Sequence, residues 1–394
     1  MKLKRTVFVV GLCILFLVCY TQMASKIDPF ARYSYITEEN EEIIRKYITD
    51  PDDIDYIISL KIQPDKFMEF IELQDFKVKN ILYYQACKLY RPIDNNEIIK
   101  FVNEYRGSYS VATFELVIKN YTYETIKNYF DNGYAYFEDA DLVEDPSKLS
   151  TILDEDDVLM DYTPSDLVTV EPTLIQVSPS IEGNDSIQLR SDAYSGLKEM
   201  MEAYAHDNYD LYKTLSLTGG FVSYEDQIKV YDAASKKYDN DLAAANAANA
   251  QNVEGEIQDQ SENSEGENTE NTENKDNKEE EKEEQTEEEK EAVKAEALDK
   301  IVDLPGRSEQ QLGFTITLKI NDLSDVTAIE KSEQYKWLSE NAHKYGYIFR
   351  YPKDKESVTG KTYQVLTLRY VGIDNATEVY DSKKAFDEIK AKDE

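Results

Sequence analysis

The chain has 394 residues, of which 41% are hydrophobic, and its formal net charge is −35. This length accommodates two ordinary domains, and the apolar fraction is sufficient for a packed core. The negative charge excludes nucleic acid and anionic lipid surfaces as main partners, because both attract Lys and Arg. The charge is uneven, since residues 251–300 hold 20 acidic residues against 6 lysines.

The N-terminal segment begins with three basic residues, Lys2, Lys4 and Arg5. An uncharged run over residues 6–24 follows, which is typical of a signal sequence or a signal anchor. Its length approaches the ~20 residues that cross a bilayer as a helix. Gln22 stands where a cleavage site prefers a small residue, so we favour an uncleaved anchor over residues 1–25, with a cleaved signal as the alternative. Because positive flanks stay inside, we expect a single-pass protein of the cell membrane with the bulk of the chain extracellular.

Residues 30–147 contain several short amphipathic stretches with apolar residues at i, i+3 and i+4 spacing. One begins at Asp50-Pro51, a cap and first-turn pair, and continues through Ile54 and Ile57. Helices this short must stack on one another to bury enough apolar surface. We therefore predict a small all-α helical module that serves as a spacer or interaction module. Its many tyrosines indicate half-buried packing, with a sugar- or peptide-binding surface as the alternative.

The remaining residues, 150–394, mix helical and strand patterns. Helices are predicted at Ala193–Tyr204 and Tyr224–Tyr238, and strands at Leu215–Val222 and at residues 314–320. This pattern predicts an α+β domain.

An acidic insert interrupts this domain at about residues 240–296. Residues 239–313 contain no aromatic residue, and the core of the stretch consists mostly of Glu, Asn, Thr, Lys and Ser. Such a composition predicts a disordered, solvated loop, with cation binding as the alternative. A solvated helix is expected to return at Glu287–Asp299.

Few residues of this chain are of the types that hold zinc through nitrogen or sulfur. The two histidines are His206 and His343, and the three cysteines are Cys13, Cys19 and Cys87. A three-ligand site rich in histidine is difficult to build from this set. We expect His206 to be exposed and His343 to pack or cap.

Two C-terminal motifs carry a family resemblance. Residues 308–313 read Ser-Glu-Gln-Gln-Leu-Gly, and residues 364–372 read Gln-Val-Leu-Thr-Leu-Arg-Tyr-Val-Gly. With the segments at 157–168 and 219–223, they resemble the VanY-type D-alanyl-D-alanine carboxypeptidases of peptidase family M15. These are zinc enzymes that trim peptidoglycan stem peptides. The resemblance implies a small antiparallel sheet flanked by helices.

The same resemblance identifies four motif positions at which the family's metal and base residues are replaced. Gln310 and Thr367 stand at the positions of histidine ligands, Thr317 at that of an aspartate ligand, and Gln364 at that of the glutamate base. Amides and hydroxyls are weak zinc ligands, and a glutamine cannot accept a proton as the base must. We therefore expect neither a zinc cofactor nor a catalytic residue.

Two peptide-binding positions of the family are retained as Gln227 and Ser308, whereas the arginine that would grip a terminal carboxylate is replaced by Val222. We predict a non-catalytic, cell-surface protein that binds a peptidoglycan stem peptide or a cell-wall protein. One alternative is an active zinc D,D-carboxypeptidase with a relocated metal site. Another is a structural scaffold with an empty groove.

Overall fold

The computed structural model describes residues 9–19, 28–136, 139–153, 156–208, 211–261 and 286–389. The chain divides into two compact units, residues 1–130 and 131–394, which are considered separately. The sequence analysis placed this boundary near residue 150. The structure places it earlier, because Tyr134 donates a hydrogen bond to the Pro305 carbonyl and Arg190 Nη1 donates to the Ser147 carbonyl at 3.1 Å.

Residues 9–19 form a helix with exposed side chains. The other residues of the predicted anchor, 1–8 and 20–25, lie outside the described residues. Within the described ranges, no helix has both the length and the apolar character needed to cross a membrane.

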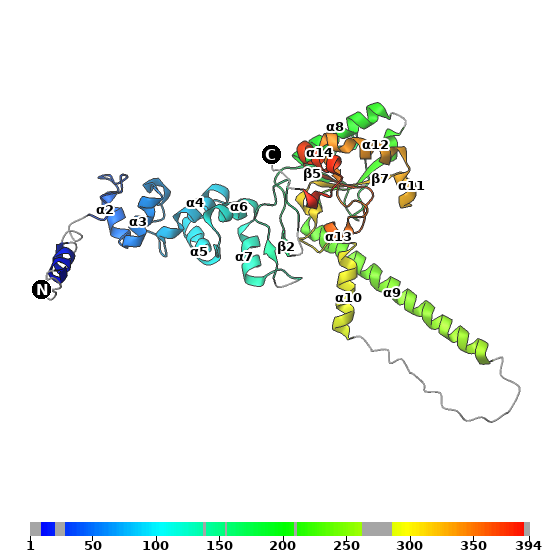
Figure 1. Ribbon diagram of the computed structural model, residues 1–394, viewed down its shortest axis with the longest axis horizontal. Helices are drawn as coiled ribbons and strands as arrows, with labels where there is room; N and C mark the ends of the chain where they lie inside the picture. Colours follow the sequence, from blue (N-terminus) through cyan, green and yellow to red (C-terminus); the bar gives the residue numbers. More distant parts are fainter. Residues whose placement is uncertain are drawn as a thin grey trace, which may run out of the picture. The chain divides into compact units, whose positions relative to one another are not determined.

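The first unit is built from short helices, as the amphipathic spacing predicts (Figure 1). They are α2 (Glu41–Tyr47), α3 (Pro51–Ser59), η1 (Pro64–Lys66), η2 (Val78–Asn80), α4 (Ile81–Tyr90), α5 (Asn95–Tyr105), α6 (Val111–Asn120) and α7 (Tyr123–Asn132). Side chains cap four of these helices, and each accepts a hydrogen bond from a backbone N–H of the first turn: Asp50 for α3, Asp94 for α5, Ser110 for α6 and Thr122 for α7. These caps satisfy donors that would otherwise be left open.

Tyrosines of this unit are used for packing. The Tyr33 hydroxyl donates to the Ile62 carbonyl at 2.5 Å, and the ring of Tyr83 meets Phe114 edge-on at 5.2 Å. Tyr84 is fully buried. Such rings contribute large apolar areas while their hydroxyls find partners, as the packing interpretation expects.

The second unit contains a five-stranded sheet in the order β4-β6-β7-β9-β8. The strands are β4 (Gln176–Val177), β6 (Leu215–Gly219), β7 (Thr315–Ile320), β8 (Tyr347–Phe349) and β9 (Thr367–Tyr370). The neighbours β4 and β6 are parallel, and the other pairs are antiparallel. Two small pairs accompany the sheet: β1 (Asp141–Leu142) with β2 (Asp157–Val158), and β3 (Leu167–Thr169) with β5 (Gln188–Arg190).

Helices flank this sheet, so the predicted mixed helix-and-sheet class is confirmed. They are α8 (Ser191–Asp207), η3 (Tyr212–Thr214), α9 (Tyr224–Ser261), α10 (Glu287–Asp299), η4 (Glu309–Leu312), α11 (Val326–Glu330), α12 (Glu333–Asn341), η5 (Ala342–Tyr345), α13 (Glu356–Thr359), α14 (Ile373–Ser382) and η6 (Phe386–Glu388).

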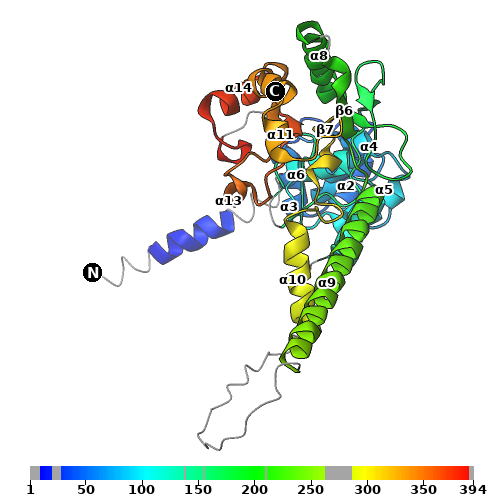
Figure 2. The same ribbon diagram turned by 90° about the vertical axis from the view of Figure 1, so that its right-hand side faces the viewer.

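The structure corrects the predicted disorder of residues 240–296 in one place and confirms the helix that was expected near its end. Helix α9 continues to Ser261, and α10 occupies the predicted range Glu287–Asp299. Residues 243–250 contain six alanines, the best helix formers, which explains why the helix continues. Figures 1 and 2 show α9 and α10 both extending away from the sheet, and Lys294 pairs with Asp239 at 2.7 Å between them. Residues 262–285 lie outside the described residues.

Helix α8 approaches its neighbours closely at Gly196. A Cβ atom added there would lie 2.6 Å from the Tyr345 carbonyl oxygen and 2.8 Å from the Tyr370 ring. Backbone cannot move aside as a flexible side chain can, so the helix requires a residue without a Cβ at this point.

We predict that Gly196→Ala destabilises the second unit by about 1–3 kcal/mol, because it overpacks this contact. The only tryptophan, Trp337, packs against Tyr204 at 5.0 Å in this unit, so its fluorescence during urea unfolding measures the loss. Ser195→Ala, on the exposed side of the same helix, should leave the transition almost unchanged. Equal stability of the two variants would contradict the packing argument.

Candidate functional site

The four motif positions lie together at one end of strands β7 and β9. Thr317 and Thr367 are register partners on the two strands. Gln310 Nε2 donates to Thr317 Oγ1 at 3.5 Å, and Thr367 Oγ1 donates to Gln364 Oε1 at 2.8 Å. Each of the four motif residues is therefore hydrogen-bonded to another of them.

Strand β6 closes the other side of this group through Gly219, the register partner of Thr317. A Cβ atom at this position would lie 3.0 Å from Thr317 Oγ1 and 3.3 Å from Gln310 Nε2. A glycine here thus allows the strand backbone to approach the two polar side chains.

A polar cavity of about 150 Å³ opens beside these residues. It is lined by Gln227, Val230, Ile301, Val302, Asp303, Glu309, Gln310, Thr315, Tyr351, Lys361, Gln364 and Thr367. Three of the four motif positions line the cavity. The fourth, Thr317, does not line it but accepts a hydrogen bond from Gln310, which does. The structure therefore brings together positions that are up to 57 residues apart in the sequence.

The two positions at which the resemblance implies peptide binding, Gln227 and Ser308, differ in placement. Gln227 lines the polar cavity, and its Nε2 donates to the Asp303 carbonyl at 2.7 Å. Ser308 is buried and is not among the described residues that line the cavity. Its hydroxyl accepts a hydrogen bond from Gln310 N at 3.2 Å as the cap of η4. Ser308 thus orients Gln310.

The residues of the polar cavity do not fit the zinc centre of the resembling family. Catalytic zinc takes three ligands from imidazole, carboxylate and thiolate groups, whereas the four motif positions offer only neutral amides and hydroxyls. Elsewhere in the described ranges, no group of three or more His, Cys, Asp or Glu residues is arranged to hold a metal ion. The side chain of His206 is 88% exposed, and His343 stacks on Tyr380 with ring centres 3.7 Å apart, as the sequence predicted for both.

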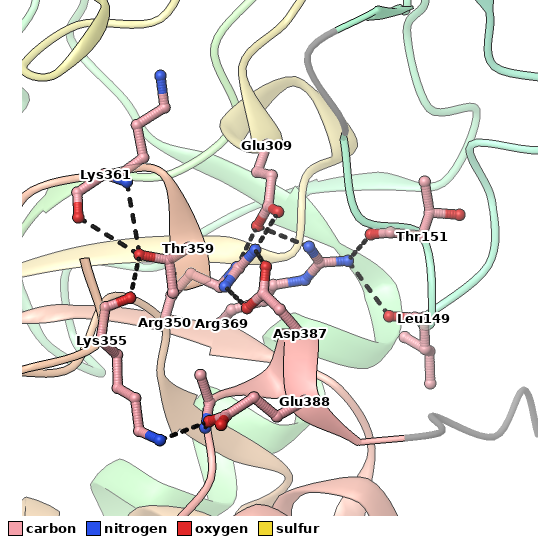
Figure 3. Close-up of polar contacts among 11 residues, drawn as sticks. Leu149, Thr151, Glu309, Arg350, Lys355, Thr359, Lys361, Arg369, Asp387 and Glu388 are labelled. Atoms are coloured by element: carbon pink, nitrogen blue, oxygen red, sulfur yellow. Dashed lines mark hydrogen bonds and ion pairs between the residues drawn. The ribbon is translucent and has the colours of Figure 1, made fainter. Parts of the chain in front are cut away.

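Behind the cavity lies a buried ion cluster formed by Glu309, Arg350, Arg369 and Asp387 (Figure 3). Arg350 makes two hydrogen bonds to Glu309, of 2.7 and 2.8 Å, and two to Asp387, of 2.6 and 3.0 Å. Arg369 Nη1 lies 2.6 Å from Glu309 Oε2 in an ion pair that is not aligned as a hydrogen bond. Bidentate hydrogen bonds between an arginine and a carboxylate are among the strongest polar contacts in proteins.

Arg369 extends the cluster toward the start of the second unit. Its Nη2 donates to the Leu149 carbonyl at 3.2 Å and to the Thr151 carbonyl. The cluster therefore joins η4, strand β9, η6 and the segment near residue 150 around one carboxylate.

Charge compensation decides the ionisation of Glu309. Burial alone would raise the pKa of its carboxyl, but the charges of Arg350 and Arg369, together with the hydrogen bonds from Arg350, outweigh this and lower the pKa to about 2. The reciprocal attraction holds the pKa of Arg350 well above its ordinary value. Sequence reasoning missed this cluster, although an arginine within an apolar strand such as Leu368-Arg369-Tyr370 requires a buried acidic partner.

Sequence reasoning also missed Lys361, whose ammonium group reaches the polar cavity. Its Nζ lies 2.7 Å from the Asp299 carbonyl oxygen, 3.1 Å from Asp299 Oδ1 and 3.2 Å from Asp303 Oδ1. Nothing in the local sequence around Lys361 indicates that it meets the end of α10, because the contact spans about 60 residues of chain.

A second cavity of about 250 Å³ lies between α12, β8 and α14. Its lining is apolar, with four lysines: Lys353, Lys355, Lys383 and Lys384. None of the four motif positions lines it, so it is separate from the polar cavity.

Residues 186–373 match the family model described as VanY, D-alanyl-D-alanine carboxypeptidase, and this segment is a VanY-family domain. The family predicted from the motifs is therefore confirmed.

Relatives share parts of the chain. A D-alanyl-D-alanine carboxypeptidase of Enterococcus faecalis is 40% identical over 87 residues, which cover 22% of this chain and 31% of that protein. The aligned segment thus spans about a third of the relative's length. Among solved structures, the LdcB LD-carboxypeptidase is 22% identical with a TM-score of 0.42, covering 65% of this chain and 89% of that one. VanYB in complex with D-alanine-D-alanine is 18% identical with a TM-score of 0.37, covering 61% and 95%.

We predict that Glu309→Gln lowers the stability of the second unit by about 3–5 kcal/mol at neutral pH, because it leaves buried guanidinium charge uncompensated. Urea unfolding followed by Trp337 fluorescence measures the change. Glu296→Gln removes an exposed pair with Lys300 and should cost no more than about 0.5 kcal/mol. A similar cost for both variants would contradict the role of the cluster.

The stability of the protein should also depend on pH through Glu309. Its pKa is lowered from 4.5 in the unfolded chain to about 2, so its contribution is fully present above about pH 4.5 and is lost as the pH falls toward 2. Unfolding midpoints between pH 5 and pH 2 should fall more steeply for the natural chain than for Glu309→Gln. Parallel profiles would show that this carboxylate does not carry the dependence.

Proposed function

We propose that this protein is a non-catalytic member of the VanY family that binds peptidoglycan stem peptide or a cell-wall protein at the cell surface. One observation carries the proposal: three of the four motif positions line one cavity, the fourth, Thr317, is hydrogen-bonded to one of them, and all four bear uncharged side chains. An ancestral-type metal centre would lie there, and its ligands are replaced at every position that the resemblance identifies.

The chemistry supports the loss of catalysis. Hydrolysis in this family relies on a metal that lowers the pKa of water and a carboxylate that takes up its proton. Gln364 cannot accept a proton, and its carbonyl oxygen already accepts a hydrogen bond from Thr367. Replacing a positioned base typically costs about 10²–10⁴ in rate even when the metal is retained.

Retention of the groove supports binding. The cavity keeps a polar lining, and Gln227, at a peptide-binding position of the resembling family, still faces it. The ligand class follows from the family of residues 186–373, whose members are described as D-alanyl-D-alanine carboxypeptidases. The basic and apolar N-terminal segment supports a location at the membrane.

Three measurements on the purified full-length chain test this proposal: zinc content, release of D-alanine from a stem pentapeptide, and binding of that peptide by calorimetry. We expect less than stoichiometric zinc, no D-alanine release and saturable binding. One zinc per chain with chelator-sensitive release would establish the active alternative. Absence of binding to the peptide would favour the scaffold.

We further predict that the triple variant Gln310→His, Thr317→Asp, Thr367→His gains a zinc site of near 1:1 stoichiometry, because it supplies three ligands of the required types at converging positions. Metal analysis after dialysis measures the gain. Thr317→Asp alone should bind no zinc, since one carboxylate is insufficient. If the triple variant stays folded and binds no zinc, the four motif positions do not correspond to a metal centre.

A further inference from the structure

The charges at the polar cavity are already paired. Three residues that line it carry formal charges: Asp303, Glu309 and Lys361. The Glu309 carboxylate is engaged by Arg350 and Arg369, and Asp303 pairs with Lys361 at 3.2 Å. Among the described residues of the lining, no cation is left for an incoming anion.

The Lys361 ammonium group is already engaged by oxygens of the protein itself. It donates hydrogen bonds to the carbonyl and Oδ1 of Asp299, at 2.7 and 3.1 Å, and it forms an ion pair with Asp303 Oδ1 at 3.2 Å. A carboxylate on the ligand would have to displace one of these oxygens. It would also approach the Asp303 carboxylate, which repels it.

The position at which the resembling family has a second cation, beside the cavity, holds an apolar residue here. Val222 stands where the resembling family has the arginine that grips a terminal carboxylate, and it is only 4% exposed. Its backbone N–H donates to the Gln310 carbonyl at 3.4 Å, so it lies next to the motif positions. A buried carboxylate without a cationic partner is unfavourable, and no bidentate partner is present here.

Neutral hydrogen-bonding groups remain instead. Thr315 lines the cavity, is 1% exposed, and its hydroxyl has no partner among the described residues. Within the same part of the chain, Gln364 Nε2 donates no hydrogen bond, and the only contact of Gln310 Nε2 is long, at 3.5 Å. Amides and hydroxyls both donate and accept, as a peptide bond does.

We infer that the polar cavity takes a peptide whose carboxyl groups are held in amide bonds, as in a cross-linked stem peptide, rather than a stem peptide with a free terminal carboxylate. This inference rests on the proposed peptide-binding function and reverses the charge preference that the family's arginine and metal would impose. The ligand class is a neutral peptide segment ending in an amide.

Calorimetric titration of the full-length chain with two synthetic pentapeptides tests the inference. Both end in D-alanyl-D-alanine, one as the free carboxylate and one as the carboxamide. We expect the carboxamide to bind about tenfold more tightly or better, since one uncompensated charge readily accounts for such a factor. Equal or tighter binding of the carboxylate overturns the inference while leaving the proposed function intact. Failure of both peptides to bind removes the two together.

Asp303→Asn provides a second, independent measurement. The change removes a repelling carboxylate and frees one donor of Lys361, so affinity for the carboxylate peptide should rise about tenfold while that for the carboxamide changes less than twofold. Asp322→Asn, at an exposed residue 3.8 Å from Lys319 and outside the cavity, should change neither affinity. An equal effect of Asp303→Asn on both peptides contradicts the inference. Trp337 fluorescence verifies that each variant is folded.

Discussion

The geometry of the groove depends on the buried contact between the Glu309 carboxylate and two arginines. Glu309 lies between Ser308, which caps η4, and Gln310, which faces the cavity. Arg350 and Arg369 reach this carboxylate from the end of β8 and from β9, so the short helix is fixed against the sheet by charge. The position of Gln310 follows from this contact and requires no bound ion. Groups of the protein itself thus hold the framework of the site.

The uncharged replacements are accommodated in pairs. Gln310 donates a hydrogen bond to Thr317, and Gln364 accepts one from Thr367. Both glutamine side chains are thus paired with an uncharged hydroxyl group. A buried polar group without a partner would cost stability, whereas these pairs avoid that cost. Different residues stabilise the fold and set the chemistry of the cavity. The ion cluster stabilises the fold, whereas the residues at the motif positions determine which reactions are feasible.

Much of this arrangement could be predicted from the sequence. The motif spacing located Gln310, Thr317, Gln364 and Thr367, and the alternation after Gly313 indicated strand β7. The cluster around Glu309 and the contacts of Lys361 could not be predicted, because they join segments far apart in the chain and no local pattern records them. The length of α9 was underestimated since the acidic composition suggested disorder, whereas the alanine-rich stretch after Leu242 favours helix.

The pairing of the motif residues bears on how easily substitutions at these positions are accepted during evolution. A single substitution to aspartate at Thr317 would place a carboxylate beside the amide of Gln310, with neither metal nor cation to offset it. The same holds for glutamate at Gln364 facing Thr367. Each such single change is therefore disfavoured alone, whereas several changes made together would compensate one another. The hydrogen-bonded pairs thus couple the motif positions, so that the residue at one position limits which residues its partner position tolerates.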